Sequence, residues 1–327
     1  MTPILEARSV TRRFSPRIRL GDRIAAMLGA AVDRRAVHAV TDVSLAVQPG
    51  ETLGLVGESG CGKSTLGRML AGILPPSEGE VSLSGAPPMR GRQKVTTRIQ
   101  TVFQDPFASL NPRQRIGDAI AEGPIAHGLV TRADAPAMVA DWLRRVGLDP
   151  AFATRFPHQF SGGQRQRVAI ARALAMQPAV LVCDEPVASL DVSIQAQILN
   201  LFLDLRQQLG LTCLFISHDL SVVRHVSDRV AVMYLGRIVE LGAAATVYGA
   251  PRHPYTQGLL DSVPKLMLGG NAGLDFRPIA GELPSPLSPP PGCAFHPRCP
   301  KATEICRVER PPLAAREDGR LVACHHA

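Results

Sequence analysis

A glycine-rich stretch near the start of the chain has the residue types that bind phosphate. Residues 57–64 read GESGCGKS, which fits the pattern G-x-x-x-x-G-K-[ST]. Glycines at this spacing let backbone N–H groups close around phosphate oxygens, and the lysine supplies a positive charge to the β and γ phosphates. The serine hydroxyl can hold Mg²⁺. The candidate phosphate ligands are Gly57, Ser59, Gly60, Cys61, Gly62, Lys63, Ser64 and Thr65, and Ser64 is also a candidate magnesium ligand.

Two adjacent carboxylates supply the second chemical element. Residues 180–185 read VLVCDE, an apolar run that ends in Asp184 and Glu185. Asp184 can hold Mg²⁺ directly or through water, and Glu185 is placed to polarise an attacking water. Phosphoryl transfer needs both an anionic metal ligand and an aligned nucleophile. The phosphate loop and this pair together predict phosphoryl transfer to water.

Strands that alternate with helices must position these residues. The phosphate loop lies between a short apolar run and a stretch with helical spacing, which is the context that supports the motif. Continuous apolar runs are typical of buried parallel strands, and their alternation with helical stretches predicts an α/β fold. The predicted strands are residues 43–47, 52–57, 79–85, 180–184 and 211–218, and the predicted helices include residues 63–74 and 193–210.

A third stretch identifies the family. Residues 160–174 read FSGGQRQRVAIARAL and resemble the signature of ABC transporter ATP-binding subunits. A serine cap and flexible glycines at a helix N-terminus suit the binding of a γ-phosphate. The resemblance implies a P-loop ABC ATPase with a RecA-like parallel-sheet core, an antiparallel β subdomain and a helical subdomain. It also implies a head-to-tail dimer with two ATP molecules in the interface, each facing the other subunit's signature residues Ser161, Gly162, Gly163 and Gln164.

Four further residues take expected roles from this resemblance. Gln104 matches the glutamine that senses Mg²⁺ and contacts the transmembrane partner, and His218 matches the histidine that contacts the γ-phosphate. Asp191 belongs to the loop that crosses the dimer interface. Phe14 is the candidate for stacking on adenine, with a core phenylalanine as the alternative. The expected cofactors are ATP and Mg²⁺, the expected catalytic residues are Glu185, His218 and Gln104, and the expected magnesium site is Ser64, Gln104 and Asp184.

Several stretches resemble one branch of that family, the dipeptide/oligopeptide importers. They include FQDPFASLNPR at 103–113 and HPYTQGLL at 253–260, and the likeness is greatest to the second, F-type ATPase subunit. The resemblance implies an ABC nucleotide-binding domain at residues 1–250, with a helical subdomain at about 105–178. Residues 251–327 are then expected to form a C-terminal extension that carries cysteines and packs onto the main domain.

The expected function is that of an ATP-hydrolysing subunit that powers import of dipeptides or oligopeptides. Its expected partners are a second homologous ATPase, two transmembrane permease subunits and an extracytoplasmic solute-binding protein, with no nucleic acid. The expected location is the cytoplasmic face of the cell (inner) membrane, as a peripheral protein. The ATPase domain is common to ABC proteins with different functions. Import of another solute such as nickel is therefore one alternative, and a soluble ABC-type ATPase of an enzyme or nucleic-acid complex is another.

Four cysteines gather near the end of the chain, at Cys293, Cys299, Cys306 and Cys324. Their spacing, C-x5-C-x6-C-x17-C, matches neither a zinc knuckle nor a bacterial ferredoxin, and thiolates suit both zinc and iron–sulfur clusters. The family resemblance implies a [4Fe-4S] cluster, with Zn²⁺ or no metal as alternatives. In a reducing compartment, clustered cysteines more often bind metal than form disulfides.

Composition limits the remaining possibilities. The 327 residues carry a net charge of +8, and no apolar run approaches the roughly 18–20 residues that cross a bilayer. The first residues have no signal-peptide layout. Eight arginines and three acids lie in residues 1–35, which indicates a solvated basic loop or a contact with an anionic surface. Many members of the resembled family lack about 20 of these residues, so residues 15–36 are interpreted as a basic insertion.

Overall fold

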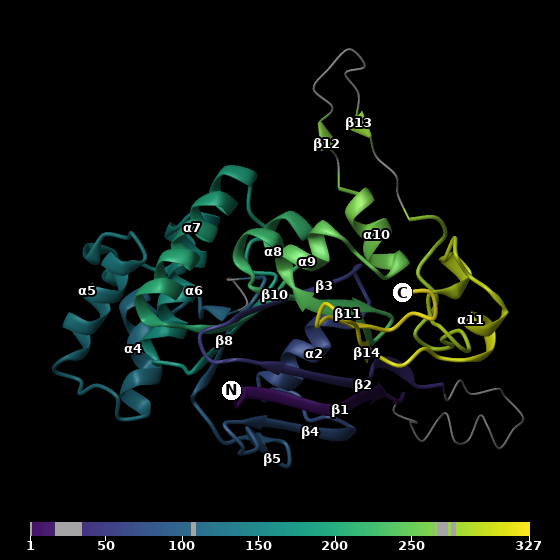
Figure 1. Ribbon diagram of the computed structural model, residues 1–327. Helices are drawn as coiled ribbons and strands as arrows, with labels where there is room; N and C mark the ends of the chain where they lie inside the picture. Colours follow the sequence, from purple (N-terminus) through teal and green to yellow (C-terminus); the bar gives the residue numbers. More distant parts are fainter. Residues whose placement is uncertain (1, 17–34, 106–108, 264, 267–273, 276–278) are drawn as a thin grey trace, which may run out of the picture.

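The computed structural model describes residues 2–16, 35–105, 109–263, 265–266, 274–275 and 279–327. Most of the basic insertion predicted at residues 15–36 lies outside these ranges. Among the described residues, the chain forms a central sheet, a smaller antiparallel sheet and a group of helices at one end, with the last residues at the other end (Figure 1).

The central sheet is mixed. Its eight described strands lie in the order β14-β15-β11-β10-β3-β9-β8-β7, and the run from β10 to β7 is parallel. Every residue of β3, β8 and β9 is buried, as continuous apolar strands require when both faces of a sheet are covered. The strands are β3 (Thr52–Val56), β7 (Ile99–Val102), β8 (Val180–Asp184), β9 (Thr212–Ile216), β10 (Arg229–Tyr234), β11 (Arg237–Ala243), β14 (Ala314–Ala315) and β15 (Leu321–Val322).

The smaller sheet is antiparallel and covers one side of the phosphate-binding helix. Its described strands are β1 (Leu5–Phe14), β2 (Val37–Val47) and β4 (Glu78–Leu83), in the order β2-β1-β4. Alternating buried residues of β1 and β2 share one core with β3 and with α2 (Lys63–Leu70). Two short pairs complete the described strands: β5 (Met89–Arg90) with β6 (Gln93–Lys94), and β12 (Lys265–Leu266) with β13 (Leu274–Asp275).

The helices between β7 and β8 form the end of the molecule opposite the C-terminal residues (Figure 1). They share a second core, which runs under the other face of the central sheet. These elements are α4 (Ile116–Ala126), α5 (Ala135–Arg145), the short 3₁₀ segments Pro150–Thr154 and Pro157–Gln159, and α6 (Gly162–Ala175). Along the sheet lie α7 (Val192–Leu209), α8 (Leu220–Val226) and α9 (Ala244–Gly249).

We call residues 251–327 the C-terminal segment. Its described elements are α10 (Pro254–Asp261), a 3₁₀ turn η3 (His296–Arg298), α11 (Glu304–Val308) and the strands named above. The segment does more than pack onto the main domain, because β15 pairs with β11 and so adds strands to the central sheet. A buried ion pair fixes the same junction: Arg320 lies 3.2 Å from Glu240, and their side chains are 3% and 0% exposed.

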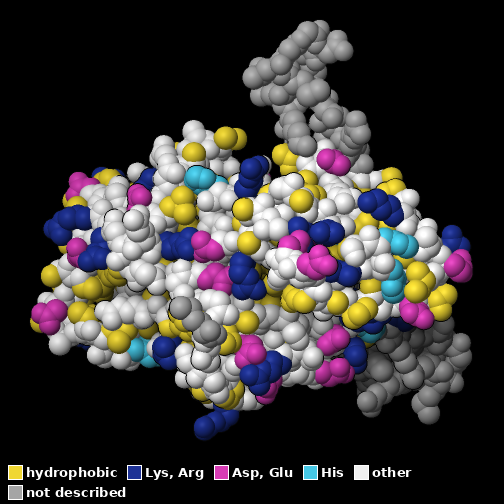
Figure 2. Space-filling model, in the orientation of Figure 1, with side chains coloured by type: hydrophobic (Ala, Val, Ile, Leu, Met, Phe, Trp, Pro, Cys, Tyr) yellow, Lys and Arg dark blue, Asp and Glu magenta, His cyan; other side chains and the backbone are white. Residues whose placement is uncertain are grey.

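The predicted α/β class, with a parallel core and an antiparallel sheet, is confirmed by this topology. The helix predicted to end at Gly210 is α7, and Gly210 caps it with φ +61°. Acidic and basic side chains are interspersed on the face in Figure 2. Among the described residues we find no helix that is both long enough and apolar enough to span a membrane.

Candidate functional site

An open pocket of about 470 Å³ lies where the phosphate loop, β1 and the end of β8 meet. The structure brings nine of the predicted site residues together around it. Those that line the pocket are Phe14, Ser59, Gly60, Gly62, Lys63, Ser64, Thr65, Gln104 and Glu185. Phe14 is 39% exposed, so it is a pocket residue and not the core phenylalanine of the alternative reading.

The phosphate loop owes its shape to glycine and to one buried cation. Gly62 has φ +109°, and a Cβ there would overlap the carbonyl oxygen of Ala39, so no other residue fits. Lys63 is 4% exposed, and its ammonium donates to the carbonyl oxygens of Gly57, at 2.8 Å, and of Glu58, at 3.0 Å. The loop therefore holds its lysine at the place where phosphate oxygens can replace these carbonyls.

Cys61 lies on the inner side of the loop and is 1% exposed. Burial raises the pKa of its thiol, so the side chain is a small neutral packing group. Neither Cys61 nor Gly57 lines the pocket in this structure. Their predicted contact with phosphate is accordingly a matter of backbone N–H groups.

Two of the three predicted magnesium ligands, Ser64 and Asp184, are in direct contact. The Ser64 hydroxyl donates to Asp184 Oδ1 at 2.8 Å. Asp184 is 7% exposed, and burial raises the pKa of its carboxyl while the Ser64 hydrogen bond opposes that rise. A divalent cation at this position would offset the cost of the buried charge. The donor set, a hydroxyl and a carboxylate beside a phosphate-binding lysine, suits Mg²⁺.

Glu185 and His218 meet at the ends of neighbouring parallel strands. Asp184, the last residue of β8, pairs with Ile216 of β9, and the Glu185 N–H donates to the Ile216 carbonyl at 3.0 Å. This places Glu185 at φ +50°, a region that non-glycine residues seldom occupy. His218 Nδ1 then lies 3.2 Å from Glu185 Oε2. Backbone strain of this kind is found at functional sites, where neighbouring structure holds it.

The signature residues lie away from this pocket, at the N-terminus of α6. Ser161 Oγ accepts from the Gln164 N–H at 3.3 Å, and Gln164 Oε1 accepts from the Ser161 N–H at 3.0 Å, which is a reciprocal capping box. Asp191 caps α7 in the same way by accepting from the Ile194 N–H, and this bond holds the pKa of its carboxyl below the usual range. Neither group lines the pocket of its own chain, and their role across a dimer interface stays a prediction.

Three lining residues were not predicted from the sequence: Val37, Ala39 and Pro286. Val37 and Ala39 belong to β2, opposite Phe14 and its neighbours on β1. Pro286 comes from the C-terminal segment, and its carbonyl oxygen accepts from the His38 N–H at 2.9 Å. The only sequence signal for Pro286 was the proline-rich composition of residues 278–291.

The four C-terminal cysteines do come together in space. Burial raises the pKa of the Cys293 thiol, and the nearby thiols of Cys306, Cys299 and Cys324 raise it further. Among the described residues, however, no group of three or more His, Cys, Asp or Glu side chains is arranged to hold a metal ion. The predicted zinc or [4Fe-4S] site therefore gains no support beyond the gathering of four free thiols.

Comparison with known proteins agrees with this site. Residues 40–188 match the model of the ABC transporter family, and residues 239–306 match that of the oligopeptide/dipeptide transporter C-terminal region. The chain is similar to the oligopeptide transport ATP-binding protein AppF of Bacillus subtilis, with 50% identity over 88% of this chain and 89% of that one. It is also similar to the di/tripeptide transport ATP-binding protein DppF of Pseudomonas aeruginosa, with 48% identity over 100% and 98%.

A solved structure shows the same fold. It is cbiO1 of Clostridium perfringens, part of the ABC transporter complex cbiONQ, with 28% identity, a TM-score of 0.62, and 76% of this chain and 92% of that chain covered. Relatives at about half identity span nearly the whole chain, and the matched models cover the phosphate loop, the signature residues, the Asp184–Glu185 pair and residues 239–306. The protein belongs to the ATP-binding proteins of ABC transporters and is an ABC-type ATPase.

Proposed function

We propose that this ATPase powers the import of dipeptides or oligopeptides through a membrane ABC transporter. The observation that carries the proposal is the joint match of the ATPase motifs and of the oligopeptide/dipeptide C-terminal region, with relatives named for peptide transport over the whole length. The site geometry supplies the chemistry such a subunit needs.

In the proposed reaction, Lys63 leaves the carbonyls of the phosphate loop and binds the β and γ phosphates of ATP. Ser64 and Asp184, with Gln104 beside the pocket, are the residues that would hold Mg²⁺, which supplies positive charge to the phosphates when bound. Glu185 orients and polarises the attacking water. His218, in contact with Glu185, fixes that carboxylate and reaches toward the γ-phosphate.

The proposal includes a second ATPase subunit arranged head to tail. The N-terminus of α6 offers Ser161 and the N–H groups of its first turn, and Asp191 begins the neighbouring α7. Ser161 and Asp191 each cap a helix, yet neither lines the nucleotide pocket of its own chain. A dimer would bring them to the partner's nucleotide, where a helix N-terminus favours a phosphate.

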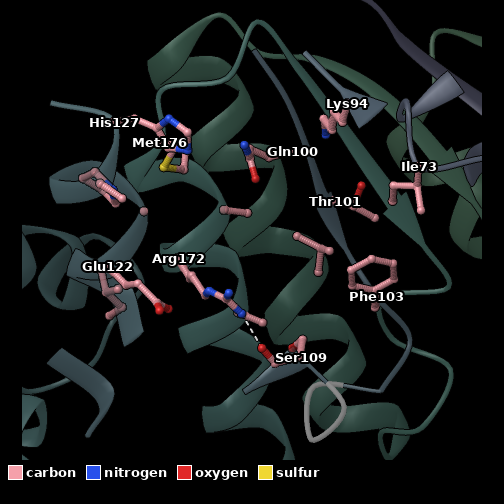
Figure 3. A pocket seen from close by; sticks show the side chains of 17 residues that line it. Ile73, Lys94, Gln100, Thr101, Phe103, Ser109, Glu122, His127, Arg172 and Met176 are labelled. Carbon is pink, nitrogen blue, oxygen red and sulfur yellow. Dashed lines mark hydrogen bonds between the residues drawn. The ribbon is translucent and has the colours of Figure 1, made fainter. Parts of the chain in front are cut away.

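A second pocket, of about 440 Å³, is our candidate for the permease contact. Figure 3 shows it between the edge strand β7, which presents Gln100 and Thr101 and is followed by Phe103, and the helices that present Glu122 and Arg172. The Arg172 guanidinium donates to the Ser109 carbonyl and so ties α6 to the segment after Gln104.

Phe103 lines this second pocket, and the next residue, Gln104, lines the nucleotide pocket. A helix of a transmembrane partner seated here would therefore be one residue from the magnesium site. This arrangement favours two permease subunits as partners and a peripheral position on the cytoplasmic face of the cell membrane. A solute-binding protein would deliver the cargo from the other side.

The test is a Glu185→Gln variant assayed with the full transporter. We expect ATP hydrolysis to fall about 10²- to 10⁴-fold while ATP still binds, because only the group that activates water is lost. An exposed acid on α7, Asp204→Asn, is the matched control and should keep the wild-type rate. Hydrolysis by Glu185→Gln at the wild-type rate would contradict the mechanism.

The cargo is tested separately, by uptake of a labelled dipeptide and of Ni²⁺ into cells with and without the gene. Dipeptide uptake that depends on the gene is the expected result. Uptake of nickel alone would overturn the peptide assignment. Purification of the ATPase without any membrane subunit would instead favour a soluble ABC-type ATPase.

We also propose that the four gathered thiols hold a [4Fe-4S] cluster. The donor set of four cysteines supports it, although their arrangement suits no single metal ion. Iron and sulfide analysis after anaerobic purification tests it, with the four-fold Cys→Ser variant as control. Zinc in the wild type, or no metal in either protein, would contradict the cluster.

A further inference from the structure

The C-terminal segment contacts the phosphate loop at Glu58. Arg298 lies in η3, between Cys293 and Cys299, and its guanidinium forms a two-pronged ion pair with Glu58 of the loop. Nη1 lies 2.7 Å from Oε2 and Nη2 lies 3.0 Å from Oε1. The Arg298 side chain is 4% exposed and that of Glu58 is 28% exposed, so the pair is partly shielded from solvent and salt. The two residues are 240 positions apart in the chain.

A second group of the C-terminal segment binds the same residue. The Glu58 backbone N–H donates to the hydroxyl of Tyr255 at 2.9 Å. Tyr255 is fully buried at the start of α10, and its ring packs against Tyr234 and Phe295, with centroids 4.6 and 5.4 Å away. Because these rings are closely packed, the hydroxyl has little freedom to move.

Glu58 is therefore shared between the C-terminal segment and the catalytic lysine. Its carboxylate accepts from Arg298, its N–H donates to Tyr255, and its carbonyl accepts from the Lys63 ammonium at 3.0 Å. When Lys63 turns to a phosphate, only the last of these bonds must break. The other two keep the loop in place, so the loop does not have to be reordered as ATP binds.

Two further contacts restrict the position of the Arg298 side chain. Its Nε donates to the Ala280 carbonyl at 3.0 Å, and the guanidinium lies 6.0 Å from the centroid of the Tyr234 ring. The ion pair with Glu58 raises the pKa of Arg298, so the guanidinium is charged throughout the working range. A guanidinium that contacts Glu58, the Ala280 carbonyl and the Tyr234 ring is more strongly fixed in position than a flexible surface cation.

We propose that Arg298 is a positioning residue of the ATP site, through which the C-terminal segment presets the phosphate loop for nucleotide binding. The proposal rests on the ATPase function described above and adds a residue of the cysteine-bearing segment to it. It is specific about the step affected: loop order before ATP binds, and not the attack of water.

The test is the Arg298→Gln variant of the full chain in its membrane complex, with ATP hydrolysis measured against ATP concentration. Loss of a partly shielded, charge-assisted pair is expected to raise KM for ATP about tenfold and to leave kcat within about twofold. Arg298→Lys keeps the charge but not the fork, so it should restore part of the affinity. In a Glu58→Gln background, Arg298→Gln should have much less further effect, because the pair is already broken.

Two control variants separate positioning from stability. Arg307→Gln removes an exposed guanidinium from the same segment, and its KM should equal that of the wild type. Arg320→Met loosens the segment at its junction with Glu240, which is linked to Glu58 only indirectly, through His253 and Tyr255. This variant should lower the melting temperature and raise KM much less than Arg298→Gln does. The proposal is overturned if Arg298→Gln leaves KM unchanged, or if Arg320→Met raises KM equally. Absence of ATPase activity in the wild type would instead count against the proposed function.

Discussion

One buried histidine is expected to make the stability of the protein fall at mildly acidic pH. His253 is 1% exposed and caps α10, where its Nδ1 accepts from the Tyr255 N–H at 3.0 Å. The backbone N–H of His253 donates to Glu240 Oε2 at 2.9 Å. Burial lowers the pKa of the imidazole from its ordinary 6.5 to about 4. Protonation would also destroy the acceptor that caps the helix.

The sign and size of the effect follow from this difference. Between about pH 4 and 6.5 the unfolded chain holds a proton on this ring and the folded chain does not. The contribution of the neutral ring to the free energy of unfolding is therefore fully present above pH 6.5 and is lost as the pH falls toward 4. Each pH unit in this window costs about 1.4 kcal/mol, so lowering the pH from about 7.5 to about 5 should cost about 2 kcal/mol through His253 alone.

The assay is urea unfolding at both pH values for the wild type and for His253→Asn. The asparagine oxygen can replace Nδ1 as the cap but does not titrate, so the variant should lose about 2 kcal/mol less between the two pH values. His225→Asn changes an exposed histidine on α8 and should keep the wild-type dependence. Equal losses in the wild type and in His253→Asn would refute the reasoning.

Three other changes test the packing around the site. Gly54→Ala should destabilise the protein by about 1–3 kcal/mol in urea unfolding, because the added methyl would overlap Val223, and an unchanged midpoint would contradict this close packing. Arg320→Ala should cost about 3–5 kcal/mol, because it leaves Glu240 buried without its partner, and the second change Glu240→Gln should recover part of the loss. Asp184→Asn should raise the melting temperature while abolishing Mg²⁺-dependent hydrolysis, because burial already raises the pKa of this carboxyl; a lower melting temperature would contradict that account.

The residues that act on phosphate could be predicted because their geometry is local. Lys63 begins a helix just after a strand, and Asp184 ends a buried strand. The hydrophobic periodicity and the spacing of the motifs therefore place both residues at one edge of a sheet. The contact between Glu185 and His218 follows from the pairing of two neighbouring parallel strands. Each of these facts depends on only a few adjacent residues.

Other parts of the site depend on contacts that no local pattern encodes. Pro286 was part of a proline-rich stretch that indicated only the absence of helix, yet it lines the nucleotide pocket. Arg298 stood between two cysteines, which drew the interpretation toward metal binding, while its side chain reaches the phosphate loop. The strand β15 was missed because two residues are too short for a detectable alternation.

These contacts connect the C-terminal segment with the central sheet and with the nucleotide site. It joins the central sheet through β15, and it touches the nucleotide site twice, through Pro286 at the mouth of the pocket and through Arg298 behind the phosphate loop. Arg298 is next to Cys299, and the turn that carries it is tied to α11 by the bond from the Cys293 N–H to the Cys306 carbonyl. A chemical change at Cys299 is therefore expected to affect the position of Arg298, which binds Glu58. Cys299 thus lies next to the residue that we propose positions the phosphate loop, and a change at this thiol that shifts η3 is expected to alter the KM for ATP.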